Sequence, residues 1–132
     1  MKPKVVLCGS YHRRPDYLRR IFRELEATGC RVLSPISLSF TDTSEPVVRT
    51  SSEYDLSISD LERFHLRALR DADFVWLHAP DGHVGVSAAY ELGYASALQK
   101  PVFCFTAPAD EMLATRVQIV CSVFEALESL TT

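Results

Sequence analysis

Short apolar runs alternate along the chain with longer segments whose apolar residues recur every three or four positions. The runs at 4–8, 31–34 and 74–78 have the length and composition of buried strands. Two further buried strands are predicted at 102–106 and 117–121. Because most of these runs are apolar throughout instead of alternating with polar residues, we expect helices to cover both faces of the sheet.

The segments with helical periodicity also carry signals for where they begin and end. Helices are predicted over 15–28, 56–69, 87–99 and the C-terminal segment after Ser122. Gly29 is suited to end the first of them. Ser59 and Glu62 have the spacing of a capping box within or at the start of the second, and Ser122 and Glu125 have the same spacing at the start of the last.

The order of these elements predicts the fold class. Five alternating β and α units, joined by right-handed crossovers, form a doubly wound, mainly parallel five-stranded sheet with helices on both faces, as in three-layer Rossmann- or flavodoxin-like α/β proteins. Ligands of such sheets bind at the carboxyl ends of the strands. We therefore expect the site in the loops after Cys8, Ser34, His78 and Thr106, with the aperiodic segment 35–52 as a long loop near it.

Composition narrows the choice of partner. The 132 residues suit a single domain over 1–132, with 47% hydrophobic and 23% charged residues. A net charge of -3 argues against binding to nucleic acid or to a membrane surface, so a small-molecule partner is expected. No run is long enough to span a bilayer and no signal peptide is evident. We expect a cytoplasmic protein whose four cysteines are buried, reduced thiols: Cys8, Cys30, Cys104 and Cys121.

Glu91 is the first candidate for chemistry. It follows a buried strand and a glycine-containing loop, and it lies in the first or second turn of the predicted helix 87–99. The helix dipole stabilises an ionised carboxylate there, and a nucleophile or base must be ionised. The stripe formed by Ala88, Leu92 and Ala95 packs on the sheet, with Glu91 at its edge. On the residues alone, Glu91 either faces a cleft or lies on a solvated flank.

The segment ADFVWLHAPDGHVGVSAAYELGYASALQKPVF, with VVLCGS and GCRVLSP earlier in the chain, resembles the nucleoside 2-deoxyribosyltransferase-like family. That family includes deoxyribosyltransferases and 2′-deoxynucleoside 5′-monophosphate N-glycosidases. ELGYA followed by KPV is the most specific part, and the likeness omits residues 36–55. The resemblance implies that Glu91 attacks the anomeric carbon of the sugar and forms a ribosyl-enzyme ester, as in retaining glycosidases.

The resemblance also implies which loops hold a 5′-phosphate, namely the one after the first strand and the turn before the Glu91 helix. Arg13 and Arg14 at the start of the first helix are plausible phosphate contacts from their chemistry alone. Asp81 is a candidate polar contact, and Tyr90 is a candidate for stacking on the base. The expected substrate-binding residues are Gly9, Ser10, Tyr11, His12, Arg13, Asp81, Gly82, Gly85, Ser87 and Tyr90.

Two positions depart from the family pattern. His65 stands where members usually carry Asp, and Gly85 stands where they carry Asp or Ser. An imidazole can donate a proton near neutral pH, so His65 either replaces the acid in catalysis or is a structural histidine. The departures also permit a non-catalytic nucleotide-binding or sensing module. A phosphoribohydrolase, suggested by a loose likeness of PDGHVG to a PGGxGT loop, is a weaker third reading.

No cofactor is predicted. The chain has neither a Walker A sequence nor a full GxGxxG, which disfavours nucleoside triphosphates and NAD. A metal site at His78, Asp81 and His83 is also disfavoured, since no fourth ligand is evident. By analogy with the family members that use monophosphates, the loop 9–14, which is suited to hold a phosphate, favours hydrolysis over transfer. Family members commonly complete their sites with a neighbouring subunit, so the resemblance implies a homo-oligomer, most simply a dimer.

Overall fold

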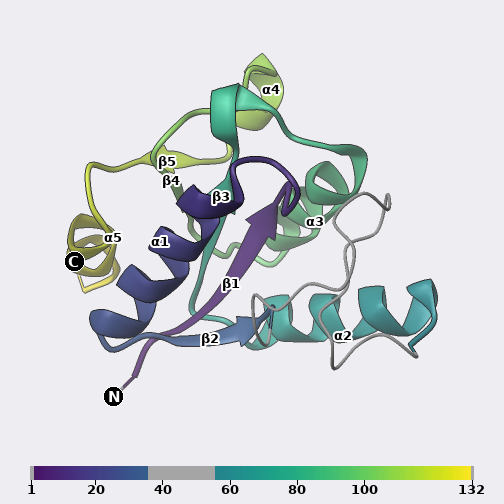
Figure 1. Ribbon diagram of the computed structural model, residues 1–132, viewed down its shortest axis with the longest axis horizontal. Helices are drawn as coiled ribbons and strands as arrows, with labels where there is room; N and C mark the ends of the chain where they lie inside the picture. The colour runs from purple at the N-terminus through teal and green to yellow at the C-terminus, as the bar shows by residue number, and fades with distance from the viewer. Residues whose placement is uncertain (1, 36–55, 132) are drawn as a thin grey trace.

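A five-stranded parallel sheet forms the centre of the computed structural model, which describes residues 2–35 and 56–131 (Figure 1). Every neighbouring pair of strands is parallel, which confirms the predicted doubly wound sheet. The predicted loop 35–52 lies outside the described residues except for Pro35. In spatial order the strands are β2 (Arg31–Ser34), β1 (Lys4–Gly9), β3 (Phe74–His78), β4 (Val102–Cys104) and β5 (Gln118–Ile119).

Helices cover both faces of the sheet (Figure 1). The helices of the described segments are α1 (Pro15–Ala27), α2 (Ile58–Asp71), α3 (Val86–Ala97), α4 (Glu111–Ala114) and α5 (Val123–Leu130). Helices α1 and α5 share one core cluster, and α2 and α3 share the other. The short helix α4 was not located from the sequence. In the described segments, no helix is both long and apolar enough to cross a membrane.

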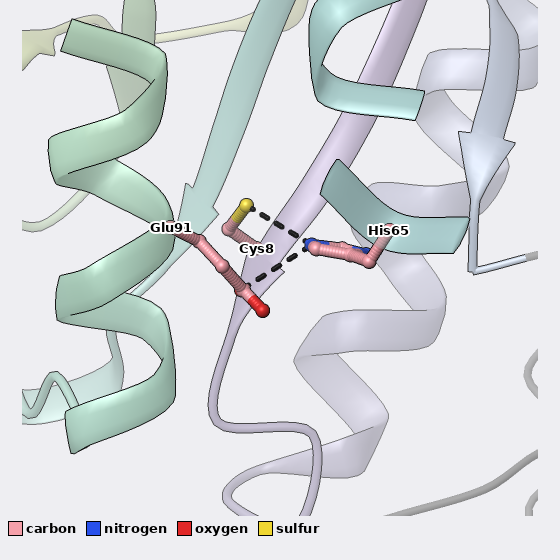
Figure 2. Close-up of side chains that lie close together, drawn as sticks. All are labelled: Cys8, His65 and Glu91. Atoms are coloured by element: carbon pink, nitrogen blue, oxygen red, sulfur yellow. Dashed lines mark hydrogen bonds and ion pairs between the residues drawn. The ribbon is translucent and has the colours of Figure 1, made fainter. Parts of the chain in front are cut away.

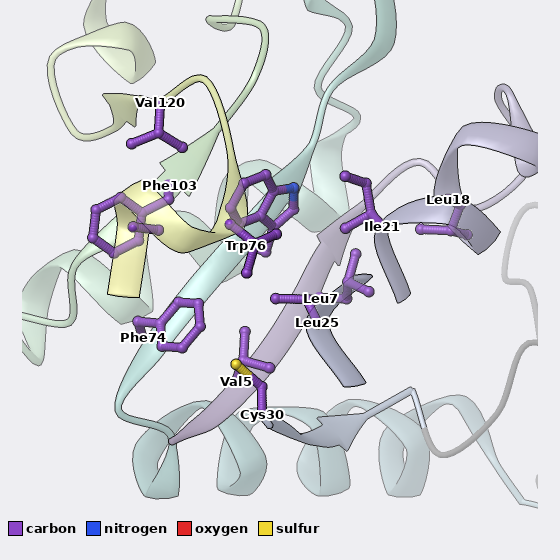
Figure 3. Close-up of a cluster of buried hydrophobic side chains, with 12 residues drawn as sticks. Val5, Leu7, Leu18, Ile21, Leu25, Cys30, Phe74, Trp76, Phe103 and Val120 are labelled. Carbon is purple, nitrogen blue, oxygen red and sulfur yellow. The ribbon is translucent and has the colours of Figure 1, made fainter. Parts of the chain in front are cut away.

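The strands divide their side chains between the two cores because successive residues point to opposite faces. Val5 and Leu7 join the core under α1 and α5, whereas Val6 and Cys8 join the core under α2 and α3. Figure 3 shows the first of these clusters, where Trp76 lies among aliphatic and aromatic side chains and is 1% exposed. Both cores together hold β1 and β3 at the centre of the sheet.

Several predicted boundaries are corrected. Helix α2 is capped by Ser57, whose hydroxyl accepts a hydrogen bond from the amide of Asp60 at 3.0 Å, so the predicted Ser59–Glu62 capping box is wrong. The Ser122 cap is confirmed, because its hydroxyl accepts from the amide of Glu125 at 3.1 Å. Strands β4 and β5 are shorter than predicted, because the chain leaves the ladder after Cys104 and after Ile119 to form turns.

Exposed side chains correct two further expectations. Cys121 lies exposed in the turn before α5, whereas Cys8, Cys30 and Cys104 are buried as predicted. All four are free thiols. From their apolar periodicity, Phe64, Phe105 and Phe124 are expected in the core, but all three are exposed. Phe105 lies beyond the end of β4 and Phe124 lies in the first turn of α5, where a regular pattern does not guarantee a packing partner.

The chain reverses direction across the sheet between β1 and β3. Strand β1 is the second in the sheet, with β2 at the edge on one side of it and β3, β4 and β5 on the other. The loops after β1 and β3 therefore leave the sheet in a crevice at its carboxyl edge. This arrangement directs attention to the last residues of β1 and to the helices that pack beside them.

Candidate active site

Three side chains from three elements meet beside the end of β1. Figure 2 shows Cys8 on β1, His65 on α2 and Glu91 on α3 pointing toward one another. His65 Nε2 lies 3.2 Å from Glu91 Oε1 and 3.5 Å from Cys8 Sγ. Cys8 Sγ, a ring nitrogen of His65 and a carboxylate oxygen of Glu91 all lie within 4.8 Å of one another. The sequence predicts His65 and Glu91 as catalytic residues, and the structure brings these two into contact.

Helix α3 places Glu91 in the interior. Ala88, Leu92 and Ala95 on the same helix are buried against the sheet, and Glu91 beside them is only 8% exposed. The alternative of a Glu91 on a solvated flank is therefore wrong. A buried carboxylate requires partners that replace its lost hydration. His65 on α2 supplies one of them.

Helix α2 and strand β2 together fix the ring of His65. The helix packs through Ala68 and Leu69 against the sheet, which turns His65 toward the end of β1. On the other side of the ring, Ser34 Oγ at the end of β2 lies 2.8 Å from His65 Nδ1. Both ring nitrogens are thus engaged, and the imidazole bridges the ends of two neighbouring strands. This orientation depends on β2, on α2 and on β1 at once.

Glu62 lies one helical turn before His65 and adds a second carboxyl group to the site. Burial, the charge of Glu91 and a hydrogen bond with its side chain raise the pKa of Glu62 from 4.5 to about 7, although His65 opposes this. Glu62 Oε1 is buried without a hydrogen-bond partner among the described residues. Glu62 and Tyr94 also line a cavity of about 560 Å³ between α2 and α3. Two adjacent carboxyl groups, one of them with a raised pKa, are typical of acid and base pairs in active sites.

The thiol of Cys8 is held in its neutral form. Burial chiefly raises the pKa of Cys8 well above its ordinary value, and the charges of Glu91 and Glu62 raise it further. The protonated thiol is a weak hydrogen-bond donor beside His65 Nε2. Cys8 is therefore not prepared to act as a nucleophile by itself, since the thiolate is the reactive form.

Protonation of Glu62 makes stability depend on pH. Its pKa is higher in the folded chain than in the unfolded chain, so its contribution to stability is full below pH 4.5 and is lost as the pH rises through about 7. As the pH rises from about 5 to about 8, we expect the free energy of unfolding to fall less for Glu62→Gln than for the wild type. Urea denaturation at both pH values measures this, with the exposed Glu26→Gln as the control. Equal pH dependence in wild type and Glu62→Gln would contradict the assignment.

The first loop is tied to the end of β3. The amide of Arg13 donates to the carbonyl of Ser10 at 3.1 Å, and His78 Nε2 lies 2.7 Å from the Arg13 carbonyl. Burial lowers the pKa of His78, and its hydrogen bond to this carbonyl partly opposes that effect, so the ring donates as a neutral imidazole. The hydroxyl of Tyr11 donates to the carbonyl of Leu7, so this predicted contact is already engaged within the fold.

The basic residues of this loop differ in what they contact. Arg14 has a left-handed backbone conformation at the start of α1, and its guanidinium donates to Tyr17 Oη at 2.6 Å and lies over the same ring. His12 and Arg13 are exposed beside it. Of the two arginines considered for phosphate, Arg14 is thus occupied on its own helix, whereas the side chain of Arg13 faces solvent.

The turn before α3 contains the other predicted contacts. Gly82 is buried, its amide donates to the carbonyl of Ala79, and its carbonyl accepts from the amide of Ala109, so both of its main-chain groups are used within the fold. Gly85 precedes the first turn of α3 and offers that turn no side-chain cap. Ser87 and Asp81 are exposed, and Tyr90 is 59% exposed.

Sequence reasoning missed Cys8, Ser34 and Glu62 as site residues, although it placed the site at the ends of β1 and β2. One signal was available for Glu62. It precedes His65 by three positions, and residues at this spacing lie on the same face of a helix. No comparable signal marks Cys8 or Ser34, because their approach to His65 depends on how α2 packs across the sheet.

Comparisons with known proteins bear on the family and on the fold. Residues 5–129 match the nucleoside 2-deoxyribosyltransferase family. Among curated protein sequences, none matches the chain. The fold is similar to that of a CMP N-glycosidase, BcmB, from Clostridium botulinum, with a TM-score of 0.58, 17% identity, and coverage of 97% of this chain and 98% of that one. Since the family match extends over nearly the whole chain, this protein belongs to the nucleoside 2-deoxyribosyltransferase family.

Proposed function

We propose that the protein is an N-glycosidase that hydrolyses the bond between base and sugar in a nucleoside or nucleoside 5′-monophosphate. The observation that carries the proposal is the buried carboxylate of Glu91, 3.2 Å from His65 Nε2 and beside the carboxyl end of β1. Family membership supports the class of reaction, and the similar fold of a CMP N-glycosidase is consistent with it.

In the proposed mechanism, Glu91 Oε attacks the anomeric carbon while the bond from that carbon to the base nitrogen breaks. His65 donates the proton that the leaving base requires. The carboxylate stabilises the positive charge that develops on the sugar and forms a glycosyl ester. Water then attacks the same carbon, gives a proton to His65 and releases Glu91 as the carboxylate.

Glu62 keeps the nucleophile in the required form. A protonated Glu62 donates a hydrogen bond to Glu91, which stabilises the neighbouring carboxylate without placing a second negative charge beside it. This contribution is present up to about pH 7, the value to which the pKa of Glu62 is raised. Glu62 is a positioning residue in this scheme, because it acts through Glu91.

A 5′-phosphate fits the surroundings of the nucleophile. The first turn of α3 presents main-chain amides that Gly85 does not cap, and Ser87 lies in the same turn. Helix N-termini of this kind bind anions through amides and the helix dipole. Gly9 ends the neighbouring strand β1, and Ser10 and the exposed Arg13 follow it. We assign these two segments to the phosphate and the exposed ring of Tyr90 to the base.

A second candidate function is a non-catalytic nucleotide-binding module. One observation favours it: a protonated His65 would form an ion pair with Glu91 at 3.2 Å and weaken the carboxylate as a nucleophile. Nucleotides would then raise the unfolding temperature without loss of their base.

One experiment separates the two functions. Wild-type protein is incubated with ribo- and deoxyribonucleosides and their 5′-monophosphates, and free base is measured by chromatography. Release from any of them supports the glycosidase and identifies its substrate. Binding by thermal shift without release, even at high protein concentration, would support the binding module instead.

His65→Gln tests the proton donor. Glutamine retains a hydrogen-bonding side chain but cannot transfer a proton, so we expect kcat for base release to fall by about 10²-fold, with a smaller change in KM. Initial rates over a range of pH measure both constants. The basic limb of the wild-type profile, where the rate falls as the proton donor loses its proton, should also change shape. A kcat equal to that of the wild type would exclude His65 from the chemistry.

A further inference from the structure

The cluster beside β1 combines a thiol, an imidazole and a carboxylate in one place. Cys8 Sγ, His65 Nε2 and a Glu91 carboxylate oxygen all lie within 4.8 Å of one another. Glycosidic bond cleavage uses the carboxylate and a proton donor, and it has no use for the thiol. The site therefore contains a functional group that the proposed reaction does not explain.

Two of the three separations between these atoms match those of ligands around one tetrahedral ion, and the third lies within 4.8 Å. Bonds of about 2.3 Å to sulfur and about 2.0 Å to nitrogen or oxygen place S and N about 3.5 Å apart, and N and O about 3.3 Å apart. The observed distances are 3.5 Å from Cys8 Sγ to His65 Nε2 and 3.2 Å from His65 Nε2 to Glu91 Oε1. An ion could enter between these atoms with little movement of the backbone.

The outer contacts also suit a metal ligand. Ser34 Oγ lies 2.8 Å from His65 Nδ1 and can accept its hydrogen, which leaves the lone pair of Nε2 directed at Cys8 and Glu91. Histidines that bind metals are commonly oriented in this way by a partner on the other ring nitrogen. Nearby, Glu62 Oε1 is buried without a hydrogen-bond partner among the described residues and offers an oxygen for a fourth position.

We propose that Cys8, His65 and Glu91 form a binding site for Zn²⁺. The mixed sulfur, nitrogen and oxygen donor set is one that Zn²⁺ accepts readily, whereas Mg²⁺ and Ca²⁺ prefer oxygen alone. On binding, a bond forms between the metal and Cys8 Sγ, and the thiol proton is released to water. A water molecule or Glu62 fills the fourth position.

The bound ion would act as an inhibitor, a consequence that rests on the proposed glycosidase function. Glu91 cannot attack a sugar while its carboxylate holds the ion. Zn²⁺ at this site would therefore stop base release, and a chelator would restore it. Cys8 then has a role that catalysis alone does not give it, because it provides the sulfur ligand.

Co²⁺ is the probe for this site, because a bond from Co²⁺ to a thiolate gives a charge-transfer absorption band. The full chain is freed of metal with a chelator, titrated with Co²⁺, and then titrated with Zn²⁺ in competition. Cys8→Ser removes the sulfur ligand, and Cys104→Ser is the matched control, since Cys104 is also buried at the end of a strand. Circular dichroism and thermal unfolding show whether each variant is folded.

We expect one Co²⁺ per chain, displaced by Zn²⁺, with the band present in the wild type and in Cys104→Ser and absent in Cys8→Ser. Ser34→Ala, which removes an outer contact, should weaken Zn²⁺ binding about 10-fold. Absence of the band in the wild type, or its persistence in Cys8→Ser, would overturn the proposal. The band does not depend on activity. A chain that binds the metal but releases no base in its absence would contradict only the glycosidase.

Discussion

Glu91→Gln is expected to reduce the release of free base by at least about 10³-fold on every substrate that the wild type cleaves. The amide cannot form the glycosyl ester, and it offers no negative charge to the sugar in the transition state. Because Glu91 is buried next to Glu62, removing its charge should not lower the free energy of unfolding. Chromatography of the free base, with single-turnover amounts of protein, measures the effect.

The control for this variant is Glu128→Gln, which makes the same chemical change at an exposed position of α5. It should retain wild-type turnover. Equal turnover by Glu91→Gln and wild type would remove Glu91 from the mechanism. A Glu91→Gln protein that still binds nucleotides, as seen by thermal shift, would show that the loss lies in the chemical step.

Gly9→Ala is expected to destabilise the fold by about 3 kcal/mol or more. Gly9 ends β1 with a φ of +136°, and a Cβ there would lie 2.0 Å from the carbonyl oxygen of His78. The backbone of β1 fixes the position of the Cβ, and the oxygen belongs to the backbone of β3, so neither can move without disturbing the pairing of β1 with β3. Equilibrium denaturation in urea measures the loss, with circular dichroism as the signal.

Gly29→Ala separates the two causes of this loss. Gly29 also has a positive φ, +91°, but a Cβ there would meet nothing within 4 Å. Only backbone strain remains, so a loss of about 1–2 kcal/mol is expected. If Gly9→Ala were no more damaging than Gly29→Ala, then the close approach of β1 to His78 would not constrain this position.

The fold was largely predictable because its signals are local or follow from simple packing rules. The apolar runs of β1 and β3 and the period of α1 lie within single segments of the sequence. The start of α2 was misplaced, because Ser57 and Ser59 both have the chemistry of a cap and only the position of the chain decides between them. Helix α4 was not predicted, because a helix of one turn is too short to show a periodic pattern of apolar residues.

The candidate site was only partly predictable. Glu91 and His65 were found through a family resemblance and through a departure from it, and the structure adds that they touch. The contacts of Cys8 and Ser34 with His65 could not be predicted from the sequence, because they depend on packing between elements that are distant in the sequence. Both arginines of the first loop are exposed, and only the hydrogen bond from Arg14 to Tyr17 distinguishes Arg14 from Arg13, a difference that two adjacent arginines in a sequence do not reveal.

The ring of His65 links α2 to the ends of β2 and β1 through Ser34 and Cys8, and to α3 through Glu91. These contacts join positions far apart in the sequence, so each requires the closure of a large loop during folding. The cluster can therefore assemble only after β1, β2, α2 and α3 have come together. Binding at this cluster would stabilise the completed tertiary structure and no smaller part of it.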